Sequence, residues 1–143
     1  MKVSDVMTKN IKVIPHNATV RDAAKLMKDI DTGFVPVIDS ENVIGVITDR
    51  DIVLRCTAEG HNPNETKVEE VMTREFFFLY EDEDVTEAAK VMSDQQVRRL
   101  PVVNRQEELV GVVSLGDLSV DVNNDKMSGK TLEDISRPAK PDL

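Results

Sequence analysis

The segment Val-Ser-Asp-Val-Met-Thr at residues 3–8 returns as Val-Glu-Glu-Val-Met-Thr at residues 68–73. The segment from Val20 to Val37 returns in the same way from Val85 to Val102, at the same offset of 65 residues. Beyond the next loop, which is one residue longer in the second copy, the offset becomes 66, and three further pairs match: Gly45 with Gly111, Thr48 with Ser114, and Asp51 with Asp117. A two-copy repeat of this length predicts a pseudo-two-fold molecule with paired clefts where the copies meet.

The chain has 143 residues, which suits one compact domain or two very small ones. A copy of about 60 residues buries little apolar surface alone, so we expect the two copies to share a core. The expected boundaries are residues 1–60 for the first copy and 61–122 for the second. The polar residues 123–143 are expected to form a mostly disordered tail, with one helical turn near Leu132 to Ile135.

The composition, with 40% hydrophobic and 31% charged residues, is typical of a soluble globular protein. No apolar run is long enough to span a membrane, and residues 1–5 lack the apolar core of a secretory signal. Cys56 is the one cysteine of the chain, so it cannot form an internal disulfide. Together these features favour a cytoplasmic location.

The net charge of −9 argues against nucleic acid as the main partner, because affinity for a duplex comes mostly from neutralising its phosphates. It does not exclude a small anion, since charges are screened over about 8 Å at physiological salt. Aromatic residues make up only 3% of the chain, which makes a stacking platform for single-stranded nucleic acid a poor hypothesis.

Each copy is expected to form a strand, a helix, a two-stranded hairpin and a second helix. In the first copy these are a strand at 11–14, a helix that starts near Val20 and stops at Gly33, strands at 34–38 and 43–47, and a helix at about 49–58. In the second copy they are a strand at 76–80, a helix from Val85, strands at 100–103 and 109–113, and a helix from 115 to about 122. The crossover helix implies parallel pairing of the strands around it, which gives a small mixed α/β unit twice.

Two further local features are expected within these elements. Thr19 and Asp22 resemble a cap at the start of the first helix. In the helix at 49–58, Ile52, Val53 and Cys56 are expected to face inward, with Leu54 as a further candidate.

The polar residues that indicate function are Thr48-Asp49-Arg50-Asp51 and Ser114-Leu115-Gly116-Asp117. In each stretch a hydroxyl closes a buried strand and opens a helix, and a carboxylate follows three residues later. The start of a helix suits phosphate, and a carboxylate beside it can accept both hydroxyls of a ribose. The same spacing fits a capping box, in which the two side chains only stabilise the helix start. The spacing leaves both interpretations open.

Pro36 and Pro101 occupy matching positions in apolar strands. Because proline lacks an N–H donor, these positions should be sheet edges or strand starts. That would leave open surface beside the neighbouring residues Phe34, Val35, Arg99 and Leu100. One interpretation is protection of a sheet edge, and the other is a slot for a flat apolar ring.

Arg98 and Arg99 are a doubled basic site that precedes a strand of the second copy. They could be a solvated pair, or they could face a phosphate at the Ser114 stretch through forked hydrogen bonds. The first copy has Gly33 and Phe34 there, so the two clefts should differ.

Other chemistries find less support in the sequence. His16 and His61 lie far apart without ligand-like neighbours, which disfavours a zinc site. Cys56 lies among apolar helix positions and is expected to be a core thiol. The chain has no Walker loop, no Gly-x-Gly-x-x-Gly motif and no catalytic constellation, so we do not expect an enzyme.

These motifs resemble the tandem cystathionine-β-synthase (CBS) domain family, the paired module often called a Bateman domain. The resemblance covers residues 3 to about 120 and rests on Val-x-x-Val-Met-Thr at 3–8 and 68–73, Phe-Val-Pro-Val at 34–37, Arg-Arg-Leu-Pro-Val at 98–102, Gly-Val-Ile-Thr-Asp-Arg-Asp-Ile at 45–52, and Gly-Val-Val-Ser-Leu-Gly-Asp-Leu at 111–118. It implies two βαββα repeats packed about a pseudo-two-fold axis, and modules of this kind usually pair again into a homodimer.

The resemblance also implies which residues bind a ligand. Asp51 and Asp117 would hold a ribose, and Thr48 and Ser114 would contact the ribose or a phosphate. The remaining implied contacts are Asn10, Ile11, Glu75 and Phe76 around the base, Phe34, Val35, Pro36, Arg99, Leu100 and Pro101 as walls, and Arg50 and Arg98 at a phosphate.

By resemblance, the protein would be a non-catalytic sensor of AMP, ADP, ATP, NAD or S-adenosylmethionine that signals through its conformation or dimer packing. Such a module needs no cofactor, and an unidentified protein is a further expected partner, because the repeats make up nearly the whole chain. The alternative is a structural or stress-linked homodimer whose clefts stay empty. A ligand can shift a conformational equilibrium only by its difference in affinity between the two states.

Overall fold

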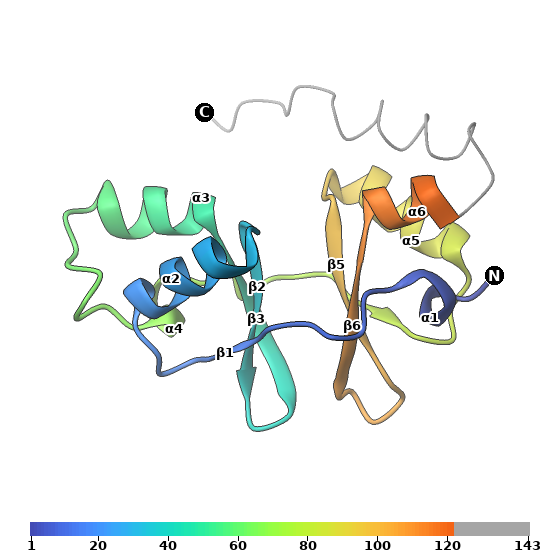
Figure 1. The fold of residues 1–143 in the computed structure, drawn as a ribbon, viewed down its shortest axis with the longest axis horizontal. Coiled ribbons are helices and arrows are strands. Elements are labelled where there is room, and N and C mark those ends of the chain that lie inside the picture. Colours follow the sequence, from blue (N-terminus) through green and yellow to red (C-terminus); the bar gives the residue numbers. More distant parts are fainter. Residues whose placement is uncertain (122–143) are drawn as a thin grey trace. The chain divides into compact units, whose positions relative to one another are not determined.

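The computed structural model describes residues 1–121, and it confirms the expected mixed α/β class with two three-stranded sheets and their helices (Figure 1). The chain forms two compact units. The first unit comprises residues 11–76 and 107–109, and the second comprises residues 1–10, 77–106 and the described residues from 110 onward. The tail expected at 123–143 lies outside the described residues.

The sheet of the first unit has the strand order β1-β2-β3. Strand β1 (Ile14–Pro15) pairs in parallel with β2 (Phe34–Asp39), and β2 pairs antiparallel with β3 (Asn42–Thr48), as the crossover and hairpin pattern predicts. The strand expected at 11–14 is wrong in extent, because only two residues pair with β2, at Val37 and Ile38. The β1 side of Pro36 is therefore unpaired, which allows a proline inside the middle strand.

The crossover helix α2 (Val20–Ile30) begins with the predicted cap. The Asp22 N–H donates to the Thr19 hydroxyl at 3.1 Å, and the Thr19 N–H donates to the Asp22 carboxylate at 3.1 Å. The expected stop at Gly33 is wrong, because the helix ends at Asp31, which adopts the left-handed conformation with φ 53°. Aspartate tolerates this conformation better than most residues, and it takes the place that glycine usually has at a helix end.

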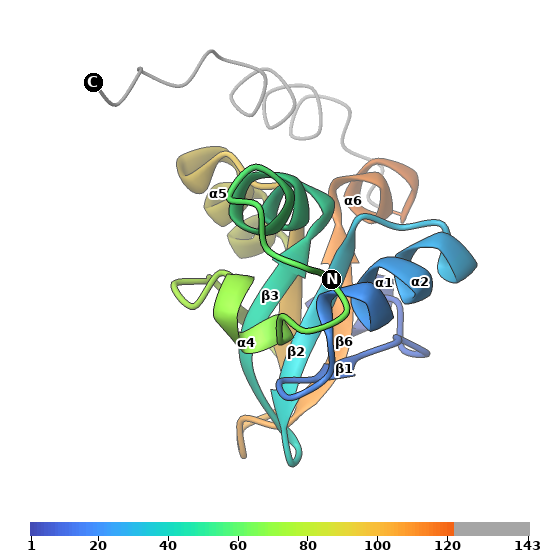
Figure 2. The ribbon, with the colours of Figure 1, turned by 90° about the vertical axis from the view of Figure 1, so that its left-hand side faces the viewer.

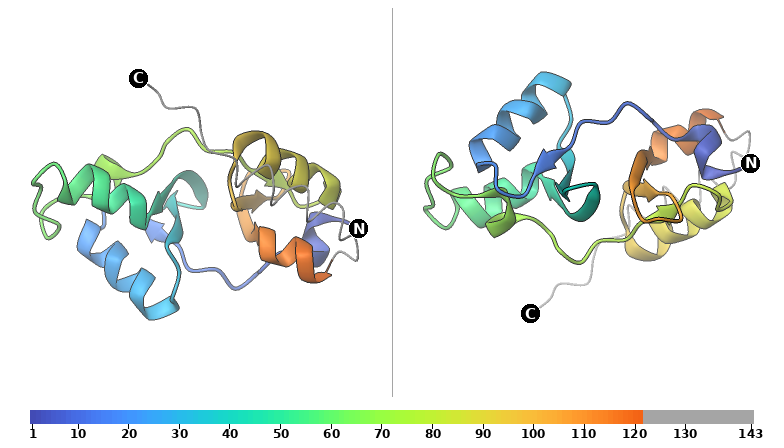
Figure 3. Two further views of the ribbon diagram at one scale, coloured as in Figure 1. Left: turned by 90° about the horizontal axis from the view of Figure 1, so that it is seen from above. Right: turned by 90° about the horizontal axis from the view of Figure 1, so that it is seen from below.

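The helix expected at about 49–58 differs from the prediction. A short α3 (Asp49–Asp51) continues as the π-helix η1 (Ile52–Thr57), in which the Ala58 N–H donates to the Val53 carbonyl at 2.8 Å. Cys56 is fully buried as expected, but Val53 is 56% exposed and Leu54 is 47% exposed. The predicted inward position of Val53 is wrong because a π-helix has a wider turn than the α-helix on which the prediction was based. Figure 3 shows η1 beside α2, with which it packs.

The second unit repeats the plan with β4 (Leu79–Tyr80), α5 (Val85–Gln95), β5 (Arg99–Val103), β6 (Leu109–Ser114) and α6 (Leu115–Asp121). The strand order is β4-β5-β6, β4 is parallel to β5, and α5 packs against α6 (Figure 3). The strand expected at 76–80 shortens to its last two residues, and Phe77 and Phe78 are exposed.

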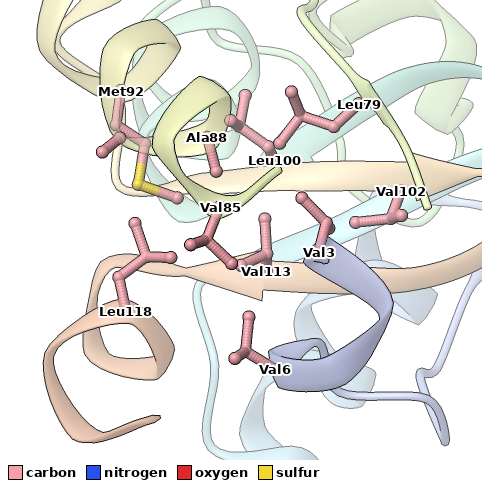
Figure 4. Packing of buried hydrophobic residues seen from close by; sticks show 11 residues of the cluster. Val3, Val6, Leu79, Val85, Ala88, Met92, Leu100, Val102, Val113 and Leu118 are labelled. Atoms are coloured by element: carbon pink, nitrogen blue, oxygen red, sulfur yellow. The ribbon is translucent and has the colours of Figure 1, made fainter. Parts of the chain in front are cut away.

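Two four-residue helices, α1 (Val3–Val6) and α4 (Val68–Val71), were not expected. They lie in the repeated segments 3–8 and 68–73. Each short helix docks in the unit that contains the sheet of the other sequence copy. In the second unit α1 places Val3 and Val6 in the core with Val85, Val113 and their neighbours (Figure 4). In the first unit α4 lies beside β3 (Figure 2) and places Val68 and Val71 in the core. The copies thus exchange their leading segments.

The chain that follows each short helix lies directly against a glycine. Thr73 pairs with Val46 through two backbone hydrogen bonds of 2.8 and 3.0 Å, and Thr8 pairs with Val112 through bonds of 2.9 and 3.0 Å. A Cβ atom at the neighbouring Gly45 would lie 2.8 Å from the Thr73 carbonyl oxygen. Glycine permits this approach because it has no side chain.

Within residues 1–121, no helix has the length and apolar character needed to cross a bilayer.

Candidate ligand-binding corners

The first candidate site is the turn from β3 into α3, here called the Thr48 corner and made by Thr48 and Asp51. The Thr48 N–H donates to Asp51 Oδ2 at 3.0 Å, and the Asp51 N–H donates to Thr48 Oγ1 at 3.1 Å. This reciprocal pair is a capping box, since each side chain satisfies a backbone donor that the helix start leaves open.

The second candidate site is the turn from β6 into α6, here called the Ser114 corner and made by Ser114 and Asp117. The Ser114 N–H donates to Asp117 Oδ2 at 2.8 Å, and the Asp117 N–H donates to Ser114 Oγ at 3.1 Å. The capping geometry predicted from the spacing is present at both corners. Capping engages the hydroxyl as an acceptor and one carboxylate oxygen, so a ligand could still reach the other oxygen wherever it is open.

The two carboxylates differ in their surroundings. Asp51 is only 8% exposed, and its two oxygens accept the Thr73 hydroxyl at 3.0 and 3.2 Å. Asp117 is half-buried, and the Ser114 N–H is the one donor that reaches its carboxylate within the described part of the chain. Thr73 was not among the candidate residues. The repeated Met-Thr pair at 7–8 and 72–73 was the signal that could have indicated it.

Arg55 is a second residue that the sequence did not indicate. Its Nη1 donates to the carbonyl oxygens of Met72 at 3.0 Å and Val71 at 3.4 Å, and its Nε lies 3.9 Å from Asp51 Oδ1. The guanidinium thus connects η1 to the end of α4. It also places a positive charge close to the Asp51 carboxylate.

The strand residues proposed as walls lie next to the corners, but most of their side chains are in the cores. Phe34 is paired with Thr48 across the β2–β3 ladder, and Arg99 begins β5. The side chains of four candidates are buried: Val35, Pro36, Leu100 and Pro101. Of the six wall residues, only the half-buried Phe34 and the exposed Arg99 present a side chain at the surface.

The three arginines predicted for phosphate are exposed. Arg98 lies directly at the Ser114 corner, because its carbonyl oxygen accepts the Leu115 N–H at 2.8 Å. The side chains of Arg50, Arg98 and Arg99 form no hydrogen bond or ion pair with any other residue of 1–121. All three guanidinium groups are therefore available to an anion.

The residues proposed around the base lie outside the helices and strands. Asn10 ends the first stretch of the second unit, whereas Ile11 and Phe76 begin and end the main stretch of the first unit. Asn10 and Glu75 are exposed, whereas Ile11 and Phe76 are half-buried.

The first unit also has a surface hollow of about 290 Å³ that the sequence did not indicate. Its lining comes from the end of α2 and the start of α3, and consists of Met27, Lys28, Asp31, Thr32, Gly33 and Asp49. The Asp49 carboxylate lies over Gly33, where a Cβ atom would be 2.5 Å from Asp49 Oδ2. The matching residues of the second unit are Arg98 and Leu115, so this acidic feature has no counterpart there.

The ion pairs with shifted pKa values lie away from both corners. A hydrogen bond of 2.6 Å to His16 lowers the pKa of Glu69, and a bidentate pair with Arg105, at 2.8 and 2.9 Å, lowers the pKa of Asp82. Arg105 also covers the ring of Tyr80 at 4.1 Å. No group of three or more His, Cys, Asp or Glu side chains within residues 1–121 is arranged to hold a metal ion.

Comparison with known proteins gives matches over the same repeats. The chain matches the CBS domain family at residues 3–57 and again at 68–121. It is 40% identical over 134 residues to the CBS domain-containing protein YhcV of Bacillus subtilis, and the match covers 94% of each chain.

Solved structures agree with this match. The conserved CBS domain protein TA0289 of Thermoplasma acidophilum, of unknown function, superposes with a TM-score of 0.81 at 29% identity, over 94% of this chain and 75% of that one. CBSX2 in complex with AMP gives a TM-score of 0.72 at 25% identity, over 82% and 93%. The CBS domain pair of MJ0100, in complex with 5′-methylthioadenosine and S-adenosyl-L-methionine, gives 0.71 at 30% identity, over 83% and 93%.

Proposed function

Since the chain belongs to the CBS domain family and carries two copies of the domain, we propose that it is a non-catalytic regulatory module that binds an adenosine-containing ligand. The observation that carries this proposal is the repeated corner, in which a hydroxyl and a carboxylate meet at a helix start in both units. Two similar structures hold AMP, or methylthioadenosine and S-adenosylmethionine, which share the adenosine group.

In this proposal the carboxylates of Asp51 and Asp117 accept hydrogen bonds from ribose hydroxyls. A carboxylate has two oxygens with about four acceptor positions, so it can keep its capping bond and still bind a diol. The exposed guanidinium groups of Arg50, Arg98 and Arg99 would neutralise a phosphate if the ligand carries one. Asn10, Ile11, Glu75 and Phe76 are the proposed contacts of the base.

Binding would act by shifting the population of conformations or the packing of a homodimer. An affinity near 1 μM corresponds to about −8 kcal/mol, which is ample for a switch of a few kcal/mol. Exposed Val53 and Leu54 on η1 support the homodimer, because two neighbouring large apolar side chains on one short helix favour a protein contact.

The alternative is a structural homodimer that binds no ligand. One observation favours it, which is that the Asp51 carboxylate is nearly buried and already bonded to Thr73. Under this alternative the corners act only as helix caps.

Thermal unfolding with a ligand panel separates the two functions. We expect AMP, ADP, ATP, NAD or S-adenosylmethionine to stabilise the protein, by about 2.7 kcal/mol when the ligand is at 100 times its dissociation constant. D117A and D51A should weaken the shift, each measured against its own ligand-free melting temperature, because each replacement also removes a capping hydrogen bond. D94A removes an exposed carboxylate on α5 and serves as the control. No shift with any of the five ligands would favour the structural homodimer.

A further inference from the structure

The two corners have the same backbone contacts but different side-chain contacts. Thr73 and Thr8 occupy matching positions and make the same pair of backbone hydrogen bonds, to Val46 and Val112 respectively. The Thr73 hydroxyl is half-buried and donates to both oxygens of Asp51. Thr8 is exposed, and its hydroxyl makes no hydrogen bond within the described residues. One threonine therefore covers its carboxylate, and the other does not.

The acceptor capacity of the two carboxylates differs accordingly. Asp51 Oδ2 accepts from the Thr48 N–H and the Thr73 hydroxyl, and Asp51 Oδ1 accepts from Thr73 and lies 3.9 Å from Arg55 Nε. Asp117 Oδ2 accepts from the Ser114 N–H, and no donor among residues 1–121 reaches Asp117 Oδ1. A ligand diol finds an open oxygen at Asp117, but at Asp51 it must displace Thr73.

The charges around the two corners also differ. Arg98 and Arg99 bring two positive side chains to the start of β5, where the Arg98 carbonyl contacts the Ser114 corner. At the matching place in the first unit, the Asp49 carboxylate lies over Gly33. Two arginines therefore flank the Ser114 corner without an acid in the place of Asp49, whereas at the Thr48 corner Arg50 lies beside the opposing charge of Asp49.

We propose that the two corners are unequal ligand sites and that Thr73 sets the difference. The Ser114 corner takes the ribose of an adenosine nucleotide directly, whereas the Thr73 hydroxyl occupies the Asp51 carboxylate and keeps the Thr48 corner closed until it is displaced. This inference rests on the proposed function. The hydroxyl and carboxylate of the family signature are present in both copies, so they cannot make the corners unequal. The inference assigns that role to Thr73.

The expected size of the effect follows from the hydrogen bond. If a ligand must displace the Thr73 hydroxyl from the Asp51 carboxylate, the loss of this hydrogen bond to a charged acceptor weakens ligand binding at the Thr48 corner by about tenfold or more. T73V replaces the hydroxyl with a methyl group that cannot donate to Asp51, so the carboxylate loses its competing hydrogen bonds while the backbone pairing to Val46 is kept. T8V is the matched control, because it makes the same replacement where no carboxylate is bonded.

Isothermal titration with AMP, and separately with S-adenosylmethionine, tests the inference on the full chain. Wild type should show one tight step of one equivalent per chain. T73V should gain a second step, at least about tenfold tighter than any second step of the wild type, and T8V should behave as wild type. In the D117N background, which weakens the Ser114 corner, the added T73V replacement should restore binding and the added T8V replacement should not.

Three results would overturn the inference in distinguishable ways. Two equal steps in the wild type would show that Thr73 does not close its corner. Equal effects of T73V and T8V would show that the hydroxyl is irrelevant. Absence of binding of either ligand to wild type and T73V would remove the proposed function itself, and the inference with it.

Discussion

His16 lies between two carboxylates of the first unit. Its Nδ1 is 2.6 Å from Glu69 Oε2 on α4, and its Nε2 is 3.8 Å from Asp39 Oδ1 at the end of β2. The matching residues of the second unit are Glu81 and Ser4, which cannot form this pair. The His16–Glu69 contact therefore holds α4, and α1 has no corresponding contact.

This contact predicts a pH dependence of stability. The pKa of Glu69 is lowered by the hydrogen bond from His16, with smaller contributions from the charges of His16, Lys67 and Arg74, and partial desolvation opposes the shift. A carboxyl whose pKa is lowered on folding stabilises the fold above its ordinary pKa of about 4.3, and this stabilisation is lost as the pH falls through the lowered value.

We therefore expect E69Q to reduce the free energy of unfolding at pH 5.5, and the difference from wild type to shrink as the pH falls through the lowered pKa of Glu69, because the wild-type carboxyl then loses its charge as well. Urea denaturation at a series of pH values measures the difference. E59Q, at an exposed position of the first unit, is the control. If E69Q and wild type differed by the same amount at every pH, the His16 contact would not contribute through the Glu69 charge.

At the scale of elements, β3 and β6 each carry a glycine that leaves room for the residues that follow a short helix. Gly45 lies against the Thr73 carbonyl oxygen and Met72 Sδ, and Gly111 lies against the Thr8 carbonyl oxygen and Met7 Sδ. A Cβ atom would approach these atoms to between 2.7 and 2.8 Å, which is closer than normal packing allows. The bridge between the strand and the exchanged segment therefore depends on glycine.

G45A and G111A should each destabilise the protein by about 1–3 kcal/mol, because the added methyl group overpacks a backbone contact that cannot move without breaking the bridge. Urea denaturation gives the free energy of unfolding. G116A is the matched control: it is helical, its Cβ would lie 3.6 Å from Ser114 Oγ, and it should be neutral or slightly stabilising. A neutral G45A would show that the segment after α4 is not held tightly against β3.

The elements show what a local pattern can and cannot predict. The helices α2 and α5 and both hairpins were predicted, because apolar periodicity and turn residues act over short stretches. The helices α1 and α4 have four residues each, too few for any periodicity, and they are stabilised by packing. The π-helix η1 was missed because its pattern was interpreted at the spacing of an α-helix.

The same limit applies to the corners. Thr48, Asp51, Ser114 and Asp117 could be found because each hydroxyl lies three residues before its carboxylate. Thr73 contacts Asp51 from 22 residues away, and Arg55 reaches Met72 from 17 residues away, so no local spacing connects them. Burial of the wall residues also depends on tertiary packing, which a continuous apolar run in a short strand does not specify.

At the scale of the whole molecule, the leading segments of the two copies are exchanged. The Val3 N–H donates to the Glu83 carbonyl at 2.8 Å, and the Val68 N–H donates to the Ala18 carbonyl at 2.8 Å. The two contacts correspond, because Glu83 and Ala18 occupy matching positions just before α5 and α2. In each contact, the leading segment of one copy binds to the other copy. The sequence cannot reveal the exchange, because both copies present the same docking surface.

The exchange predicts where a core replacement acts. V3A should loosen the second unit although Val3 belongs to the first sequence copy, and V68A should loosen the first unit. Each removes fully buried apolar atoms and should cost about 1–3 kcal/mol. Hydrogen exchange measured by mass spectrometry should show faster exchange in peptides from 79–118 for V3A and from 14–57 for V68A. E59A, at an exposed position outside both cores, is the control.

Faster hydrogen exchange in peptides from 14–57 for V3A, or from 79–118 for V68A, would contradict the swapped positions of the leading segments.

This reciprocity also bears on how such a protein could arise. A polypeptide with a single copy would have an unfilled groove at its own helix start and a leading segment with no place to dock. Two such polypeptides could fill each other's grooves, so a gene duplication followed by fusion would preserve every one of these contacts inside one chain. Within one chain each half can change separately, and Thr73 and Thr8 already differ in their side-chain contacts.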